Sequence, residues 1–402
     1  MTAARTARTA LVATLAIQIY TSFGATATAV LAPEIASAFG IDARWIGLFV
    51  GIVYAGAMLA GLASGGFIER FGSIRVSQGG VALCAAATLA VAVTPQRLPE
   101  ALAAAALVMG LGYGPITPAS SQLLQRTAAP SRMALTFSIK QTGVPAGVAL
   151  SGALLPGLAL AFGWRPTFVL VALVGAIVVA LAQPIRAGLD IERRPQRALS
   201  LAAIVGPLAV LRESSALLTL ALVSFAYSAT QVCLTSFLVV HLTGALGYPL
   251  VSAGLVLTAT TIAGAVGRIA WGVVADRLLA PRRTLGLIGA IAAACAIAMA
   301  LSTPGWPVAA IVALAACFGA TAIGWNGVQL AEVARLAPPG AAGKVTGATS
   351  VVTFAGVVVG PPLFAVLADV TGSDRAGFAM LAVASGAAAA ALFARRAHTI
   401  AR

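Results

Sequence analysis

Charged residues are scarce in this 402-residue sequence. Asp, Glu, Lys and Arg make up 9% of it, whereas hydrophobic residues make up 60%. A soluble domain carries roughly 25% charged residues, so this chain lacks the charge to cover a water-facing surface. Aromatic residues are also few, at 6%, while glycine alone contributes 42 residues. Small residues let helices approach closely in lipid, and the composition therefore indicates an integral membrane protein.

Patterns that would indicate an enzyme or a metal site are missing. The sequence has no glycine-rich phosphate loop ending in Lys-Ser or Lys-Thr, no His-Glu-x-x-His motif and no nucleophile elbow. Its four cysteines lie in apolar runs without metal-ligand spacing, so we expect neither a disulfide nor a metal. We predict that the protein is not an enzyme, takes no cofactor and works from gradients rather than from ATP hydrolysis.

Acidic side chains are missing from the middle of every long apolar run. All eleven Asp and Glu residues lie in expected loops or at the ends of runs. Exchange of a proton for a cationic drug usually needs a carboxylate inside the membrane, so this distribution disfavours a cationic substrate. Glu34 comes nearest to the membrane interior, and we expect it in an outer loop. The two histidines, His241 at the end of a run and His398 in the tail, are expected to be incidental.

Apolar runs near 20 residues, the length that spans a bilayer, recur along the chain. The first follows Arg5 and Arg8, as in a signal peptide, but its length predicts an uncleaved helix. We expect twelve transmembrane helices, at residues 11–31, 45–66, 76–93, 99–123, 133–160, 166–184, 215–240, 251–274, 285–301, 307–330, 345–367 and 376–394.

The placement of basic residues predicts the orientation of these helices. With the N-terminus in the cytoplasm, 19 of the 25 Lys and Arg residues fall on the cytoplasmic side and 4 on the other, while Lys140 and Arg268 lie inside spans. Cytoplasmic loops usually carry the excess of basic residues. We therefore expect both termini on the cytoplasmic side of a bacterial-type inner (plasma) membrane, and we attribute the net charge of +14 to topology rather than to nucleic-acid binding.

The chain is expected to form two related halves. One six-helix bundle would cover residues 1–184 and a second residues 215–402, joined by a cytoplasmic linker at 185–214. The apolar side chains of the linker fit either a short helix on the membrane interface or a plain tether. These side chains are Leu201, Ile204, Val205, Leu208 and Leu211.

The same short motif follows the second span of each half: a glycine, three residues, an acid and an arginine. With the twelve spans and the central linker, the two copies resemble the major facilitator superfamily over essentially the whole chain. The loop motif of that family is Gly-x-x-x-Asp-Arg-x-Gly-Arg-Arg. The resemblance implies an all-α fold of twelve helices in two pseudo-symmetric bundles that rock to give alternating access. The gate residues that it implies are Gly65, Glu69, Arg70, Gly72, Arg75, Gly272, Asp276 and Arg277.

Lys140 and Arg268 are expected inside the membrane, where an ionisable residue is costly and points to function. At 1.5 Å per residue, Lys140 would lie about 10 Å and Arg268 about 12 Å from the same face. In the superfamily fold, helices five and eight face each other, which would bring both cations into one cleft around an anion. The alternatives are snorkelling of Lys140 to the surface and a structural bond from Arg268 to carbonyls of a glycine-rich helix pair.

The surroundings of Arg268 are similar to those in monocarboxylate and oxalate/formate transporters, whose helix-eight arginine binds the substrate carboxylate. Those monocarboxylate transporters often carry an Asp one turn earlier, where this sequence has Gly264. Polar and aromatic side chains on other spans are expected to complete the cavity, with packing as the alternative for each. The further residues expected to bind substrate are Gln141, Tyr20, Tyr54, Tyr113, Tyr227, Gln231, Trp325 and Asn326, with Gln18 and Gln329 nearby.

Together these features predict a secondary active transporter of a small organic anion, a carboxylate, that is coupled to a proton or a counter-anion. We expect a monomer that contacts its substrate and the lipid bilayer. The alternative is a multidrug or metabolite efflux antiporter of the same fold, which the apolar helices and the sequence Gly356-x-x-x-Gly360-Pro361 favour. A membrane sensor or scaffold would need a signalling domain or a long tail, and only eight residues follow Ala394.

Overall fold

The computed structural model describes residues 3–41, 45–191, 193–196, 209, 211–212 and 214–394, and all secondary structure assigned in them is helical. Twelve helices in these ranges are long and apolar enough to cross a membrane. Each coincides with one predicted span, although several begin or end a turn or two outside the predicted bounds. The predicted all-α fold with twelve spans is therefore confirmed.

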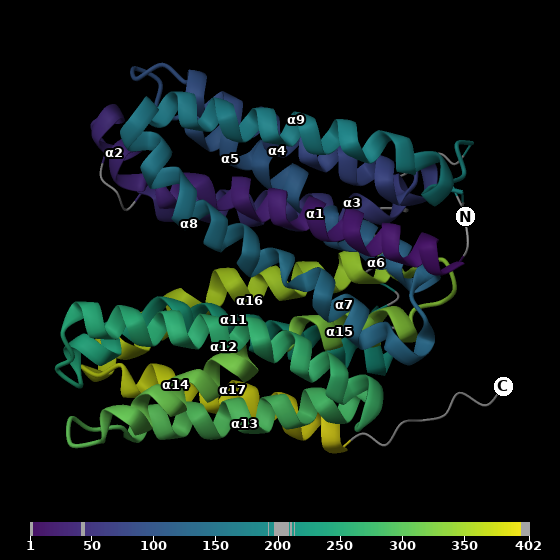
Figure 1. Cartoon of the computed structure of the whole chain (residues 1–402). Coiled ribbons are helices and arrows are strands. Elements are labelled where there is room, and N and C mark those ends of the chain that lie inside the picture. The colour runs from purple at the N-terminus through teal and green to yellow at the C-terminus, as the bar shows by residue number, and fades with distance from the viewer. Residues whose placement is uncertain are drawn as a thin grey trace. The chain divides into compact units, whose positions relative to one another are not determined.

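Figure 1 shows the helices in chain order. Up to residue 189 they are α1 (Ala3–Val30), α2 (Ala32–Phe39), α3 (Trp45–Phe71), α4 (Ser73–Val93), α5 (Ala101–Tyr113), α6 (Ile116–Thr127), the 3-10 turn η1 (Pro130–Arg132), α7 (Met133–Gln141), α8 (Gly143–Phe162) and α9 (Trp164–Leu189). From residue 215 they are α11 (Ser215–Gly244), α12 (Leu250–Arg277), α13 (Pro281–Leu301), α14 (Val308–Ala322), α15 (Asn326–Leu336), α16 (Ala342–Thr371) and α17 (Arg375–Ala394).

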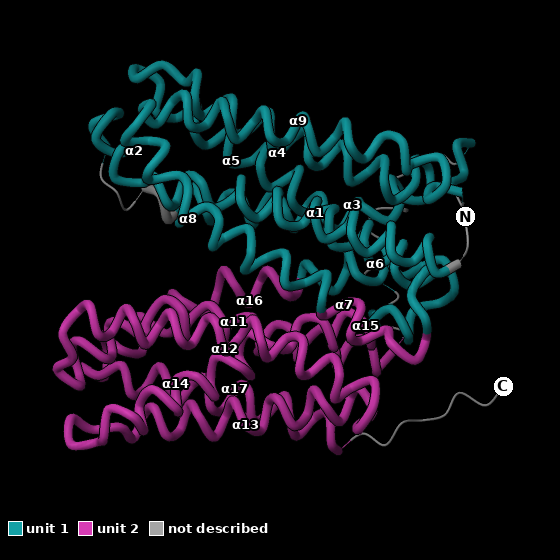
Figure 2. Tube along the Cα trace, viewed as in Figure 1, with its two compact units in different colours: residues 1–129, 139–213, 333–351 teal, residues 130–138, 214–332, 352–402 magenta. Residues whose placement is uncertain are grey.

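The chain divides into two compact units (Figure 2). Unit 1 comprises residues 1–129, 139–213 and 333–351, and unit 2 comprises residues 130–138, 214–332 and 352–402. Each unit thus contains most of one predicted half together with a short segment of the other. The six-helix halves stay a prediction. The expected linker helix lies largely outside the described residues, which include only Leu211 of its apolar side chains.

Each unit has its own hydrophobic core. In unit 1 the core includes Tyr20, Val81 and Phe168, and in unit 2 it includes Phe318 and Phe364. Glycines bring the helices together, because in lipid close van der Waals packing holds helices to one another. A Cβ at Gly110 would collide with the backbone of α3, and one at Gly267 with the backbone of α14.

Three spans are interrupted. The fifth breaks at residue 142, between α7 and α8, and the fourth and tenth break at corresponding places. The fourth span breaks at residues 114–115, between α5 and α6, and the tenth breaks at residues 323–325, between α14 and α15. Pro115 has no backbone N–H, which weakens the helix there. Breaks at membrane depth are tolerated where protein or a water-filled cavity surrounds them, and in transporters such breaks form binding sites. The breaks in the fourth and tenth spans are therefore the places where each unit can present backbone and polar groups to a ligand.

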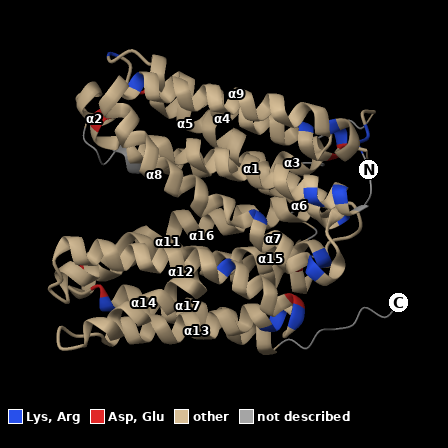
Figure 3. Ribbon diagram, viewed as in Figure 1, with Lys and Arg blue, Asp and Glu red and all other residues tan. Residues whose placement is uncertain are grey.

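Charged side chains gather at the ends of the helices, and the stretches between are nearly free of them (Figure 3). This distribution is the one expected for helices that cross lipid, where a charge in the middle is costly. Lys140 and Arg268 are exceptions, because both are almost fully buried inside long apolar helices. The candidate functional residues are these two cations and their neighbours, each described within its own unit.

Candidate functional site

Lys140 is buried in unit 1 among three neutral oxygens. The residue lies in the last turn of α7, and none of its surface is exposed. Its Nζ donates to Oε1 of Gln18 at 2.7 Å, to Oε1 of Gln141 at 3.0 Å and to Oγ1 of Thr117 at 3.4 Å. The ammonium therefore points into the unit, and the side chain does not snorkel to the surface. Neutral oxygens of this kind solvate a positive charge without cancelling it.

Local sequence explains how these oxygens reach Lys140. Gly143 starts α8 three residues after Lys140, and a Cβ at that position would lie 2.9 Å from Cβ of Gln18, so only glycine lets α8 approach α1 here. Thr117 stands in the first turn of α6, immediately after the break in the fourth span. Gln18 and Gln141 were expected near the site, whereas Thr117 was not. A hydroxyl just after a proline break was the signal that could have identified Thr117.

Tyr20, one of the tyrosines expected to complete the cavity, belongs to the hydrophobic core of unit 1. It follows Gln18 by two residues, which places it on the opposite side of a helix with 3.6 residues per turn. It is 3% exposed within the hydrophobic core. Tyr54 lies on α3 and Tyr113 at the end of α5, and their part in a substrate site stays a prediction. The structure thus groups Gln18, Gln141 and Thr117 around the lysine, and we leave Tyr20 out of the proposed site.

Arg268 is held at the break in the tenth span of unit 2. It is 2% exposed, and its Nε donates to the carbonyl oxygen of Ile323 at 3.0 Å. Glycines on α12 make this approach possible, since a Cβ at Gly264 would lie 2.6 Å from Cβ of Ile323. An aspartate at 264 would meet the same side chain, so the missing acid has a steric reason. The bond to Ile323 is the one that the structural interpretation of Arg268 predicts, and it also fixes the orientation of the guanidinium.

Three other predicted residues meet at the same break. Trp325 Nε1 and Asn326 Nδ2 both donate to Oε1 of Gln231, at 3.2 Å and 3.1 Å. Trp325 is 1% exposed, and its ring meets that of Tyr227 edge-on, with centroids 5.7 Å apart. The Tyr227 hydroxyl, however, donates to the carbonyl oxygen of Leu285 at 2.7 Å. The ring of Tyr227 therefore packs against Trp325, and its hydroxyl is hydrogen-bonded to the backbone of α13.

Two buried polar residues on α15 extend this cluster. Gln329 lies one turn after Trp325, and its Nε2 is buried with no hydrogen-bond partner among the described residues. A buried donor left in this way is costly, which makes it a candidate for contact with a ligand. Glu332 is 2% exposed, one turn before the end of α15. The sequence placed Glu332 correctly near a span end but did not show that it is buried.

The first copy of the loop motif contacts the start of α16 in unit 1. Glu69 Oε1 pairs with Nζ of Lys344 at 2.5 Å. Gly65 leaves room for this pair, because a Cβ there would collide with the Lys344 side chain. Gly72 has φ of 92° at the N-cap of α4, a conformation that favours glycine. Arg70 lies over the ring of Phe71 at 5.3 Å, so it is the acid and the glycines of the motif that join the two spans.

The second copy does the same for the start of α7 in unit 2. Asp276 accepts hydrogen bonds from the backbone N–H groups of Ala134 at 3.0 Å and Leu135 at 2.7 Å. These are unpaired donors of the first turn of a helix, whose positive end favours a carboxylate. A Cβ at Gly272 would lie 2.6 Å from Oγ of Ser138, so this glycine is again needed for the approach. Arg277 is exposed.

Replacing Asp276 with Ala is expected to destabilise the protein by about 0.5–2 kcal/mol, the usual cost of losing a helix cap. Thermal melting of the detergent-purified variants would measure how much stability each one has lost. Asp276→Asn keeps one acceptor oxygen and should lose less. Asp369→Ala removes an acid near the end of α16 and serves as the matched control. Equal stability of Asp276→Ala and the control would contradict the capping role.

Two glutamines of α6, missed by the sequence analysis, hold the turn between α15 and α16 in unit 1. Gln122 accepts from the backbone N–H of Gly343 at 2.8 Å and donates to the carbonyl oxygen of Gly340 at 2.8 Å. Gln125 donates to the carbonyl oxygen of Ala334 at 2.6 Å. These side chains satisfy backbone groups that helix ends leave unpaired. These hydrogen bonds join the end of the fourth span to the turn that follows the tenth span.

A pocket of about 470 Å³ lies beside these gate contacts in unit 1. Its charged lining includes Glu69, Arg126, Asp190, Arg193 and Arg194. Burial raises the pKa of Asp190, while hydrogen bonds from the backbone N–H groups at the start of α4 act in the opposite direction. The backbone N–H of Arg75 is one of these donors, at 3.0 Å. The first residues after α9 thus cap α4.

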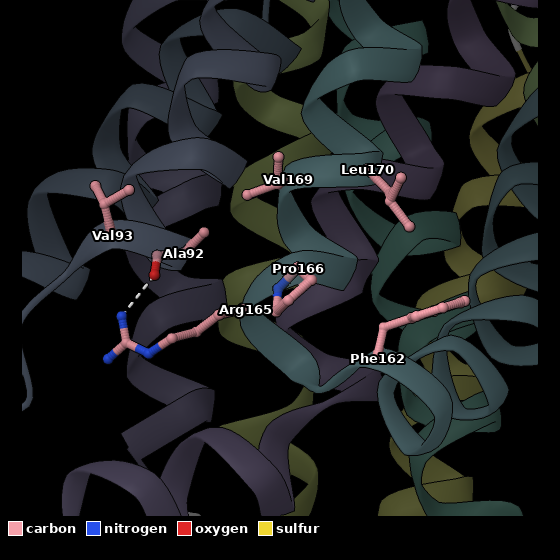
Figure 4. Close-up of a pocket in the computed structure, with 7 residues that line it drawn as sticks. All are labelled: Ala92, Val93, Phe162, Arg165, Pro166, Val169 and Leu170. Carbon is pink, nitrogen blue, oxygen red and sulfur yellow. Dashed lines mark hydrogen bonds between the residues drawn. The ribbon is translucent and has the colours of Figure 1, made fainter.

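A larger pocket, of about 530 Å³, lies between the ends of α4 and α9 (Figure 4). Arg165 crosses it and donates to the carbonyl oxygen of Ala92, which terminates α4. The rest of its lining is apolar, and Val93 and Phe162 are largely exposed, as expected for side chains that face lipid. None of the predicted substrate-binding residues lines this pocket. We therefore do not assign it to the substrate.

The sequence matches a known family over most of its length. Residues 14–361 match the family model described as Major Facilitator Superfamily. An uncharacterized MFS-type transporter of Mycobacterium tuberculosis strain CDC 1551 is 26% identical over 337 residues, which cover 84% of this chain and 74% of that protein. A hexuronate transporter of Bacillus subtilis strain 168 is 24% identical over 179 residues, which cover 42% of this chain and 41% of that protein.

Solved structures share the fold. The fucose:proton symporter of E. coli superimposes with a TM-score of 0.75 at 16% identity, covering 96% of this chain and 98% of that chain. A bacterial homologue of the iron transporter ferroportin, in an outward-facing state, superimposes with a TM-score of 0.76 at 18% identity and covers 96% and 98%. At these identities the similarity concerns the fold alone.

Proposed function

The chain belongs to the major facilitator superfamily of secondary transporters, and on that premise we propose that its substrate is a small organic anion carrying a carboxylate. It is a multi-pass membrane protein and not an enzyme. The proposal concerns what it carries and which residues bind it. Within unit 2 we assign Arg268 to the anion, and side chains at the break in the tenth span supply further donors. Within unit 1 we assign Lys140 to the same role.

The observation that carries the proposal is the oriented, buried guanidinium of Arg268. Its Nε is fixed on the Ile323 carbonyl, which sets the direction of the planar fork formed by the two terminal nitrogens. That fork matches a carboxylate with two parallel hydrogen bonds. Trp325, Asn326 and Gln231 lie at the same break, and a few convergent polar groups in apolar surroundings are typical of small-molecule sites.

Two further facts support an anionic substrate. Lys140 is fully buried within an apolar span, and its Nζ donates to side-chain oxygens of Gln18, Gln141 and Thr117. A cation at such a position is costly and points to function. The Bacillus subtilis relative is named for hexuronate, which is a sugar carboxylate. We infer that this chain recognises the same chemical group.

The loop motifs are assigned to the conformational cycle. Glu69 with Lys344, and Asp276 with the start of α7, each join two spans by contacts that a charge change or a rigid-body movement can break. We assign them, with their glycines, to holding one state of the alternating-access cycle. The excess of Lys and Arg in alternate loops supports a bacterial inner membrane with both termini in the cytoplasm.

Thermal melting of the purified protein against a panel of compounds tests this function. A ligand that binds the native state raises stability by RT ln(1 + [L]/Kd). We expect stabilisation by one class of small carboxylates and none by their amides. Glu332 is a buried acid of the kind that an efflux antiporter of cationic compounds would need. Stabilisation by lipophilic cations and by no carboxylate would overturn the anion proposal and favour such an antiporter.

A further inference from the structure

His241 is buried between three helix ends of unit 2. It lies in the last turn of α11, and none of its surface is exposed. Its Nδ1 is 2.7 Å from Oδ2 of Asp374, just before α17, and its Nε2 is 2.9 Å from Oγ of Ser302, which caps α13. The ring of Phe378 packs edge-on against the imidazole at 4.9 Å. A histidine that the sequence analysis took as incidental is thus held on both ring nitrogens.

The hydrogen bonds of Ser302 decide the protonation of this cluster. The Ser302 hydroxyl is 2.7 Å from the carbonyl oxygen of Met299, which can only accept, so Ser302 uses its single proton there. Toward His241 the serine oxygen can then only accept, and Nε2 must donate. An ionised Asp374 can also only accept, so Nδ1 must donate as well. An imidazole that donates from both nitrogens is an imidazolium.

We propose that His241, Asp374 and Ser302 form a proton-binding site that ties the ends of α11, α13 and α17 together when the proton is bound. On release, the proton leaves Nδ1 by way of Asp374, whose side chain is 17% exposed, to bulk water. Nδ1 can then only accept, as can Oδ2 of an ionised Asp374. The hydrogen bond between the end of α11 and the residue before α17 is thereby lost, while Nε2 still donates to Ser302.

Few other charges are present to compete for this proton. Arg375 donates to the carbonyl oxygen of Ser302 at 3.4 Å, so one cation stands beside the cluster. Asp369 lies in the last turn of α16, and its backbone joins the turn before α17. The last turn of α13 and the first turns of α12 and α14 carry no Asp, Glu, Lys or Arg. Histidine is the side chain whose charge ordinarily changes between pH 5 and 8.

The site lies at the opposite end of unit 2 from the Asp276 gate contact. α11 ends near His241, and α12 returns from there to Asp276. The proposed proton would therefore act on ends of helices that the gate motif does not reach. The proposed proton-binding site goes beyond the proposed anion transport and does not depend on the identity of the substrate.

Nitrogen-15 NMR of histidine-labelled protein tests this proposal directly, because the chain has two histidines. In a His398→Gln background the only signal comes from His241. Titration from pH 9 to pH 5 should show a change from one protonated ring nitrogen to two. Asp374→Asn removes the carboxylate with little change in shape and should move that change to lower pH. An imidazole that keeps the same protonation at every pH would overturn the proposal.

Uptake measurements extend the same test to transport. His241→Gln should flatten the dependence of uptake on pH, whereas Thr243→Ala, two residues away on α11, should leave it as in the parent protein. An unchanged pH profile in His241→Gln would contradict a role of this proton in the cycle. The NMR result stands apart from the anion proposal, because it needs no substrate, so failure of one does not imply failure of the other.

Discussion

Replacing Arg268 with Ala is expected to abolish binding of the carboxylate substrate while leaving the fold intact. Loss of one partner of a buried, hydrogen-bonded charge pair costs about 2–5 kcal/mol, which corresponds to roughly 30-fold or more in Kd. Arg268 Nε donates to the carbonyl oxygen of Ile323, and the prediction assigns the positive charge of the guanidinium to the anion. Kd would be measured by the ligand-dependent rise in melting temperature.

Variants at the same position separate binding from structure. Arg268→Lys keeps the charge but lacks the planar fork, so we expect weak binding that is not fully lost. Trp271, three residues later, also donates to a backbone carbonyl of α14, at 2.9 Å from the oxygen of Ala320. Trp271→Phe removes that bond alone and serves as the matched control for a merely structural effect. If Arg268→Ala bound the carboxylate as tightly as Trp271→Phe, the assignment of Arg268 would be wrong.

Replacing Lys140 with Met is expected to weaken anion binding at least tenfold and to leave or raise the thermal stability without substrate. Met has a similar length and removes a buried charge, whose desolvation is costly. Such a result would mean that the charge of Lys140 contributes to anion binding and not to the stability of the fold. Melting curves with and without a carboxylate measure both effects in one experiment.

A second variant tests the surroundings of the ammonium. Thr117→Val removes the hydrogen bond from Lys140 Nζ to Thr117 Oγ1, at 3.4 Å, and the one that Thr117 Oγ1 donates to Oε1 of Gln18, also at 3.4 Å, and it keeps the shape of the side chain. We expect a much smaller loss of anion binding than in Lys140→Met. A large loss of stability in Lys140→Met, with unchanged anion binding, would identify Lys140 as a structural residue of unit 1.

The sequence predicted the spans well because they depend on a local pattern, whereas the gate role of the loop motif stays a prediction. An apolar run long enough to cross a bilayer is visible in any window of the chain, and all twelve runs form helices. The glycine and the acid of each motif copy also act locally, at the end of one helix. Asp276 and Glu69 were therefore identified without knowledge of their partners, the start of α7 and Lys344.

The sequence was less informative about which side of a helix faces what. Gln231, Trp325 and Asn326 were expected at a site and do meet. Tyr20 and Tyr227 looked equally suitable, yet Tyr20 lies in a core and the Tyr227 hydroxyl serves a backbone carbonyl. These helices carry apolar residues on every face. The pattern of hydropathy along the sequence therefore does not show which face turns toward a site.

Contacts between distant segments were out of reach for a similar reason. The site at His241 depends on Ser302 and Asp374, which lie 61 and 133 residues further along the chain. Thr117 reaches Lys140 because Pro115 and Gly143 interrupt and bring together their helices. Such groupings follow from tertiary packing of glycine-rich helices, so a local pattern such as the break before Thr117 can mark one member but not its partners.

Uptake into proteoliposomes that contain only this protein tests the central claim most directly. Vesicles would be loaded with an unlabelled small carboxylate and diluted into buffer that contains a trace amount of the same compound in labelled form. A parallel set would use the matched amide. The account predicts that label accumulates for the carboxylate, that it does not for the amide, and that Arg268→Ala abolishes it. Accumulation of a lipophilic cation instead, with Arg268→Ala as active as the parent protein, would contradict it.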